Sequence, residues 1–294
     1  MTSRTSWKDP ELQSVIAGLK SRYKQTYLDE QAFMDRNTAW LPPPVHGEFT
    51  IAVCSDLHYA SKHCLPGAIE DWFGWARAQG ATMGISAGDN VAGCYSFLDY
   101  ELTAHGVKEQ AYLAAELWPK AHDFHWYFID GNHDYTHESK SGYAFGDTLV
   151  DVAARIGRTD FHYLGPRNAT LALHHTKDKP PVRVELWHPG GGAANPTGPM
   201  IKKIDSYGVA NQPHILIVGH YHKAAEVMHR EVHAIAGGTF EGKGSEFSKR
   251  LTGGPAIGGW VIKFGCTEDG TIRHWETMFR GYPDAPVLVN VPLH

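Results

Sequence analysis

Side chains that can bind metal ions follow five apolar, strand-like runs in this 294-residue chain. The runs are FTIAVC, TMGIS, FHWYFID, VRVELW and HILIV. Loops at the carboxyl ends of strands are where α/β folds build their sites, so we expect these side chains to lie close together. The seven candidates are Asp56, His58, Asp89, Asn132, His188, His220 and His222.

The seven side chains supply carboxylate oxygen, amide oxygen and imidazole nitrogen, with no thiolate. Divalent Mn, Fe and Zn accept this donor set. Seven ligands exceed what one ion takes from protein alone, so two ions that share a bridging carboxylate fit better, and Asp89 is the natural bridge. We therefore expect two divalent metal ions (Mn, Fe or Zn, with Mn favoured) as cofactors.

Such a centre would favour phosphate-ester hydrolysis. Two divalent ions outweigh the negative charges of Asp56, Asp89 and one hydroxide, which leaves a site with net positive charge. Metal binding lowers the pKa of water from 15.7 to roughly 7, so hydroxide becomes available at neutral pH. The chain contains 19 histidines, and most of them cannot be ligands. The metal interpretation depends on the conjunction of motifs, because each motif alone occurs often by chance.

The apolar runs alternate with helical stretches from residue 48 onward, which predicts an α/β catalytic domain over residues 48–294. The runs expected to form strands are Phe49 to Cys54, Thr82 to Ser86, Phe124 to Asp130, Val182 to Trp187, His214 to Val218, Val232 to Ala236, Trp260 to Phe264 and Ile272 to Met278. The expected helices are Pro66 to Gln79, about Leu98 to Ala121, and Tyr143 to Ile156.

Residues 1–47 differ from the rest and predict an N-terminal helical extension with a proline-rich linker. Asp9 and Pro10 form a good helix start, and apolar side chains follow at helical spacing as far as Tyr27. Leu41 to Pro44 contains three consecutive prolines, which is typical of a linker.

Charge and hydropathy limit the partners. The formal net charge of −5 offers no global attraction to a polyanion, so nucleic acid is an open partner that this charge does not support. The polar start lacks the apolar segment of a secretory peptide, and no run is long enough to span a membrane. We expect a cytoplasmic protein without membrane contact, and the sequence leaves its oligomeric state open.

The ordered motifs D-x-H, G-D, G-N-H-D, H and G-H-x-H closely resemble those of the calcineurin-like metallophosphoesterase superfamily. The resemblance implies a four-layer α/β/β/α sandwich with a binuclear site at one edge. It implies that one ion is held by Asp56, His58, Asp89 and His222, and the other by Asp89, Asn132, His188 and His220. It also implies that His133 protonates the leaving oxygen or holds the phosphoryl group.

Departures from the family patterns bear on the substrate. The Ser/Thr protein phosphatases carry Asp and Arg where this chain has Ala92 and Gly93, which disfavours protein phosphatase activity. The same change removes the acid that usually orients His133, and Asn90 and His63 are the candidates for its partner. G-N-H-D with Asp134 is more similar to the phosphodiesterase and nuclease branches.

The sequence therefore predicts a phosphodiesterase, including a nuclease, that works by attack of a metal-bridging hydroxide while His133 assists the leaving group. A phosphomonoesterase acting on a small molecule or nucleotide is the first alternative. A metal-binding scaffold without turnover is the second, although a degenerate site would usually have lost at least one ligand.

Overall fold

The structure is a computed structural model that describes residues 14, 17, 21, 37–40, 48–175, 178–191, 195–267 and 269–283. The chain divides into two units, residues 1–38 and residues 39–294. The expected helix between Pro10 and Tyr27, except for residues 14, 17 and 21, and the expected linker at Leu41 to Pro44 lie outside the described residues. The N-terminal extension over residues 1–47 therefore stays a prediction.

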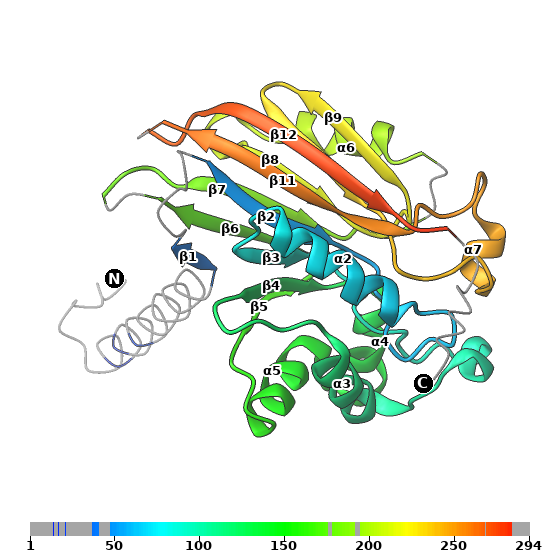
Figure 1. Cartoon of the computed structure of the whole chain (residues 1–294). Coiled ribbons are helices and arrows are strands. Elements are labelled where there is room, and N and C mark those ends of the chain that lie inside the picture. Colours follow the sequence, from blue (N-terminus) through cyan, green and yellow to red (C-terminus); the bar gives the residue numbers. More distant parts are fainter. Residues whose placement is uncertain are drawn as a thin grey trace, which may run out of the picture. The chain divides into compact units, whose positions relative to one another are not determined.

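One six-stranded sheet of the second unit contains the first three motif-bearing strands (Figure 1). Its order is β12-β11-β2-β3-β4-β5, and β2 to β5 run parallel to one another. β11 and β12 extend it by antiparallel pairing. Its strands are β2 (Phe49–Cys54), β3 (Met83–Ser86), β4 (His125–Asp130), β5 (Phe161–Pro166), β11 (Gly258–Cys266) and β12 (Ile272–Gly281).

The second six-stranded sheet contains the last two motif-bearing strands. Its order is β1-β6-β7-β8-β10-β9, with β7, β8 and β10 parallel to one another. β6 and β9 pair antiparallel at either side of that parallel group. Its strands are β1 (Thr38–Trp40), β6 (Asn168–His174), β7 (Val182–Trp187), β8 (Ile215–Val218), β9 (Ala224–His229) and β10 (Val232–Gly237).

The two sheets pack face to face through an apolar core between them. Ile51 and Val53 of β2 point into this core, where they meet side chains such as Ile215 of β8. Ala52 and Cys54 point to the other face of the first sheet, because successive side chains of a strand alternate. Both faces of β2 are therefore buried, which explains its nearly continuous apolar sequence.

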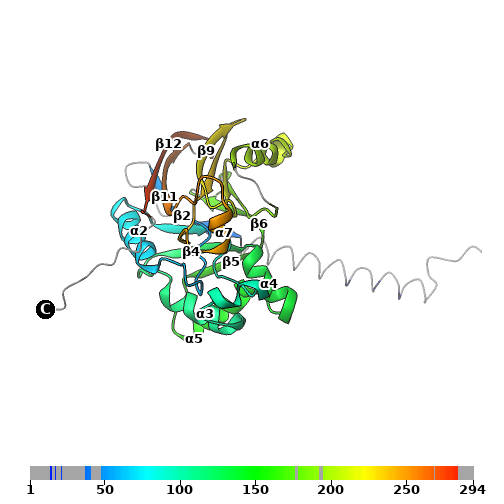
Figure 2. The same cartoon turned by 90° about the vertical axis from the view of Figure 1, so that its right-hand side faces the viewer.

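Helices cover the outer face of each sheet (Figures 1 and 2). Helices α2 (Pro66–Ala78), α3 (Gly106–Leu117) and α5 (Phe145–Arg155) pack their buried side chains on the first sheet. On the second sheet, α6 (Thr197–Asp205) packs Met200 and Ile204 against Leu216 and Val218 of β8. The domain is a four-layer α/β/β/α sandwich, which confirms the expected fold class.

Several elements differ from the sequence-based expectation. The predicted helix from Leu98 to Ala121 is two elements, the 3₁₀ turn η1 (Ser96–Glu101) and α3, and Gly106 at the start of α3 has φ 75°. Helix α4 (Asn132–Ser141) was missed because it is short and mostly polar. The other elements without a predicted counterpart are β1, β5, β6, β9, α6, the turn η2 (Val209–Asn211) and helix α7 (Glu246–Arg250).

No helix among the described residues is both long enough and apolar enough to cross a lipid bilayer.

Candidate metal centre

The seven candidate ligands all lie just beyond the carboxyl ends of their strands, as the sequence predicts. β2, β3 and β4 of the first sheet and β7 and β8 of the second each end at one of the five motifs. Three groups of acidic and histidine side chains bring ligand atoms within 4.8 Å of one another. Together these groups contain six of the seven candidates, and hydrogen bonds add the seventh, Asn132.

The first cluster consists of Asp56, His58 and His222, all of them buried. Nε2 of His58 lies 3.1 Å from Nε2 of His222. Oδ1 of Asp56 lies 3.3 Å from Nε2 of His222 and 4.0 Å from Nε2 of His58. Two imidazole nitrogens and one carboxylate oxygen therefore face a common point.

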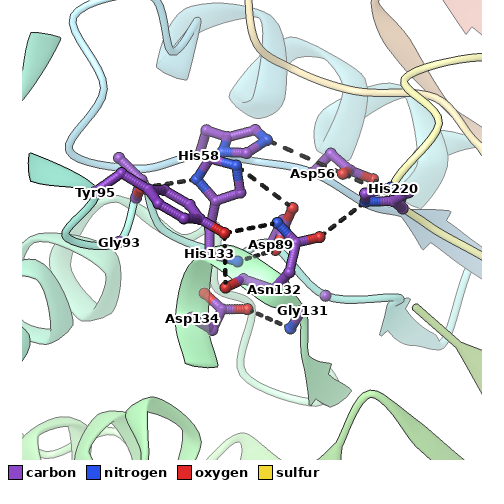
Figure 3. Close-up of polar contacts among 12 residues, drawn as sticks. Asp56, His58, Asp89, Gly93, Tyr95, Gly131, Asn132, His133, Asp134 and His220 are labelled. Carbon is purple, nitrogen blue, oxygen red and sulfur yellow. Dashed lines mark hydrogen bonds and ion pairs between the residues drawn. The ribbon is translucent and has the colours of Figure 1, made fainter. Parts of the chain in front are cut away.

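The second cluster consists of Asp89, Asn132, His188 and His220. Figure 3 labels Asp89, Asn132 and His220 of this cluster. Nε2 of His188 lies 3.2 Å from Oδ2 of Asp89 and 3.1 Å from Oδ1 of Asn132. Nδ1 of His220 lies 2.8 Å from the same oxygen of Asn132. Asp89 also belongs to a group with His58 and His133, so its carboxylate lies between the two clusters.

Hydrogen-bond chemistry shows that the second cluster fits a cation. Nδ1 of His188 lies 2.7 Å from the carbonyl oxygen of Ala87, which can only accept, so the His188 proton belongs on Nδ1. The lone pair on Nε2 then faces oxygens of Asp89 and Asn132, which are themselves acceptors. Acceptors that converge in this way need a positive ion or a proton between them, and a divalent metal ion satisfies all of them.

The pKa values of His188 and Asp89 also indicate that this cluster attracts positive charge. Burial lowers the pKa of His188, but the Asp89 carboxylate outweighs it and raises that pKa to about 9. Burial alone would raise the pKa of Asp89, yet His188 and His133 hold it well below its usual range. The carboxylate at the centre of the site is thus ionised and attracts positive charge.

Comparison with known families agrees with this donor set. The model of the calcineurin-like phosphoesterases matches residues 49–224, which contain all seven candidate ligands. The chain belongs to the calcineurin-like phosphoesterase family. This family assignment confirms the resemblance that the motifs indicate, and the acidic and histidine groups suit the divalent metals of such enzymes.

Solved structures of low sequence identity are similar to this family member. An archaeal phosphodiesterase is 15% identical, with 79% of this chain and 100% of that chain covered and a TM-score of 0.42. A phosphoesterase from E. coli is 15% identical, with 78% and 98% covered and a TM-score of 0.39. A predicted phosphoesterase from Streptococcus pneumoniae is 12% identical, with 79% and 98% covered and a TM-score of 0.37. No curated protein matches this sequence.

The backbone of this phosphoesterase is left-handed at five of the seven candidate ligands. Left-handed backbone is uncommon for residues other than glycine, and it concentrates at functional sites because surrounding contacts must hold it in place. Here, the sharp turns after the strands aim the ligand side chains at the shared edge of the two sheets. The five residues are Asp56 (φ 52°), His58 (φ 48°), Asp89 (φ 52°), His220 (φ 77°) and His222 (φ 51°).

Gly131 lets the turn after β4 approach the centre. A Cβ atom at Gly131 would lie 2.1 Å from Oδ1 of Asp89 and 2.4 Å from the Asp89 nitrogen. We expect Gly131→Ala to lower the free energy of unfolding by about 1–3 kcal/mol, since overpacking forces neighbours to shift. It should also displace Asp89 and weaken metal binding. Urea denaturation and elemental analysis of the purified variant measure both effects.

Gly74→Ala is the matched control, because a Cβ atom at this position in α2 meets no atom within 4 Å. Alanine favours a helix interior by about 0.5–1 kcal/mol over glycine, so this variant should be slightly more stable and should keep its metal. Equal stability and metal content in the two variants would contradict the packing argument for Gly131.

His133 is oriented by a backbone carbonyl, which corrects both guesses from the sequence. Its Nδ1 lies 2.8 Å from the carbonyl oxygen of Ala92. Asn90 instead donates through Nδ2 to the carbonyl oxygen of Ile129. Nε2 of His63 lies 3.6 Å from Oε1 of Glu101. The sequence could not reveal this partner, because every residue has a carbonyl group.

Asp134 has a structural role in the same motif. Its carboxylate accepts hydrogen bonds from the backbone nitrogens of Gly131 (2.8 Å), Asn90 (3.1 Å) and Val91 (3.0 Å). The bond from Gly131 caps the first turn of α4, which places Asn132 and His133 at the start of that helix. Asp134 thus ties the turn after β3 to the turn after β4.

A cavity of about 250 Å³ opens onto the centre. Its lining adds two residues that the sequence did not single out, Phe247 and Leu251. Tyr95 was also missed, and its hydroxyl oxygen accepts a hydrogen bond of 3.3 Å from Nδ2 of Asn132 (Figure 3). This bond turns Oδ1 of Asn132 toward His188 and His220.

Proposed function

We propose that this phosphoesterase hydrolyses phosphodiesters with two divalent metal ions. The observation that carries the proposal is the pair of ligand clusters with Asp89 between them. Asp56, His58, Asp89 and His222 would hold one ion, and Asp89, Asn132, His188 and His220 would hold the other. Bound ions would supply positive charge for the phosphoryl oxygens and lower the pKa of a water molecule to roughly 7.

His133 is the residue placed to assist the leaving group. It lines the cavity, and the contact with Ala92 fixes its ring. A carbonyl oxygen only accepts, so Nδ1 carries a proton, and Nε2 is the nitrogen left to exchange a proton with the substrate. Its Nε2 lies 4.0 Å from Oδ2 of Asp89, farther than the 3.2 Å that separates Nε2 of His188 from the same oxygen. This difference favours His188 as ligand and His133 as proton donor.

The cavity favours a diester over a monoester. None of the described residues that line it is Lys or Arg, so the protein adds no fixed positive charge for the second charge of a monoester. At Gly93, a Cβ atom would lie 2.4 Å from the carbonyl oxygen of His133, which leaves no room for the Arg that protein phosphatases carry there. A diester, with a single negative charge, suits this cavity better.

The test is a hydrolysis panel on protein stripped of metal and reloaded separately with Mn²⁺, Fe²⁺ or Zn²⁺. We expect bis(nitrophenyl) phosphate to be hydrolysed faster than nitrophenyl phosphate, with Mn²⁺ giving the highest rate. Faster monoester hydrolysis would reverse the substrate preference. Two bound ions without hydrolysis of either ester would favour the scaffold alternative. Single-stranded and duplex DNA in the same panel test for nuclease activity.

A further inference from the structure

Three aromatic rings lie together beside His133, and we call Tyr95, Phe97 and Phe247 the aromatic wall. The ring centroids are 5.5 Å apart for Tyr95 and Phe97, 6.1 Å for Tyr95 and Phe247, and 6.2 Å for Phe97 and Phe247. His133 makes edge contacts of 4.9 Å with both Tyr95 and Phe247. The wall therefore begins at the proposed proton donor and reaches the exposed ring of Phe97.

The wall combines two segments that are far apart in the sequence. Tyr95 and Phe97 come from the turn around η1, whereas Phe247 belongs to α7. The backbone nitrogen of Glu246 donates to Oε1 of Glu101 (3.2 Å), which ties α7 to η1. Phe97 is 54% exposed even though it packs against two other rings. Contacts with two other rings fix the position of Phe97, and its exposed face is available to a ligand.

The position of the wall identifies the part of the substrate that it contacts. Hydrolysis breaks the bond between phosphorus and the leaving oxygen, water supplies hydroxide to phosphorus, and a proton passes to the leaving oxygen. In the proposed function the leaving oxygen lies next to His133, whose ring is 4.9 Å from the rings of both Tyr95 and Phe247. The group attached to that oxygen can therefore reach these two rings and, beyond them, Phe97.

We propose that the aromatic wall stacks a nucleobase carried by the leaving alcohol, so that the substrate is a small nucleotide diester. This inference rests on the proposed function. Aromatic rings bind flat bases by stacking, which contributes about 1–3 kcal/mol per base. A lipid chain would need an apolar surface longer than the three rings of the wall. A long polyanion would need a basic surface, but the net charge is −5.

The test compares thymidylyl-thymidine with two analogues that each lack one base. A stacking contribution of 1–3 kcal/mol corresponds to about 5- to 150-fold in kcat/KM. We expect that loss for the analogue without the base of the leaving nucleoside, which product analysis identifies. The other analogue should be hydrolysed nearly as fast as the parent.

Phe97→Ala is the diagnostic variant, because Phe97 packs on the other two rings of the wall, whereas Tyr95 and Phe247 also contact His133. It should reduce the ratio of kcat/KM between parent and base-lacking analogue to nearly one. Tyr143→Ala is the control, since Tyr143 is 66% exposed and lies in a different hollow, beside α5. This control should keep the full ratio.

Equal rates for all three dinucleotide substrates, or an unchanged ratio in Phe97→Ala, would overturn the inference. So would faster hydrolysis of a decyl diester than of the dinucleotide. Hydrolysis of bis(nitrophenyl) phosphate in the same preparations shows whether the proposed function itself holds. If that diester is not hydrolysed by the metal-loaded protein, the proposed function fails, whatever the wall binds.

Discussion

Asp89→Asn is expected to lower diester turnover by at least about 10³-fold and to deplete both metal positions. Asp89 lies between the two clusters, so its loss removes a ligand from each. Bound metal ions stabilise the charge of the transition state by several kcal/mol, and losing that stabilisation lowers the rate by about this factor. Asparagine keeps a side-chain oxygen that can accept the 2.7 Å hydrogen bond from the backbone nitrogen of His133, so the turn itself should be retained.

Elemental analysis of the purified variant is the measurement, with His58→Ala and Asp71→Asn beside it. In the proposed arrangement His58 would hold the first ion alone, so its variant should lose about half of the metal. Asp71 pairs with Arg280 at the surface, and its variant should keep both ions and full turnover. Two tightly held ions in Asp89→Asn would show that Asp89 is not the bridge.

His133→Asn is expected to lose roughly 10²- to 10⁴-fold in turnover of an alkyl or nucleotide diester. It should lose much less on a nitrophenyl diester, because nitrophenolate departs readily as an anion whereas an alkoxide needs a proton. His133 is placed for this transfer by its contact with Ala92 and its position in the cavity lining. Steady-state kinetics on both substrates, together with metal content, measure the effect.

The outcomes for His133 separate three roles. Equal losses on both substrates would indicate stabilisation of the phosphoryl group instead of proton donation. Loss of one ion would make His133 a ligand, consistent with its place in a group with His58 and Asp89. Unchanged turnover of both substrates would remove it from the mechanism. His274→Asn, at a side chain that is 54% exposed, is the control for a general effect of losing an imidazole.

The sequence by itself determined the alternation of strands and helices and the positions of the candidate metal ligands. Buried parallel strands are nearly continuous apolar runs, and their carboxyl ends meet at one edge. Polar residues directly after such runs are therefore expected to converge, as Asp89, His188 and His220 do after three different strands. The glycine of the G-N-H-D motif also has a local physical reason, because a Cβ atom at position 131 would clash with Asp89.

Only the tertiary structure decided how His133 is held and what surrounds it. Its partner is the carbonyl group of Ala92, which carries no side-chain signature in the sequence. The aromatic wall joins Tyr95 and Phe247, whose positions are 152 apart, through rings that look like ordinary core residues in the sequence. Such contacts depend on how separate loops fold over the same edge, and neither hydrophobic period nor motif spacing encodes that arrangement.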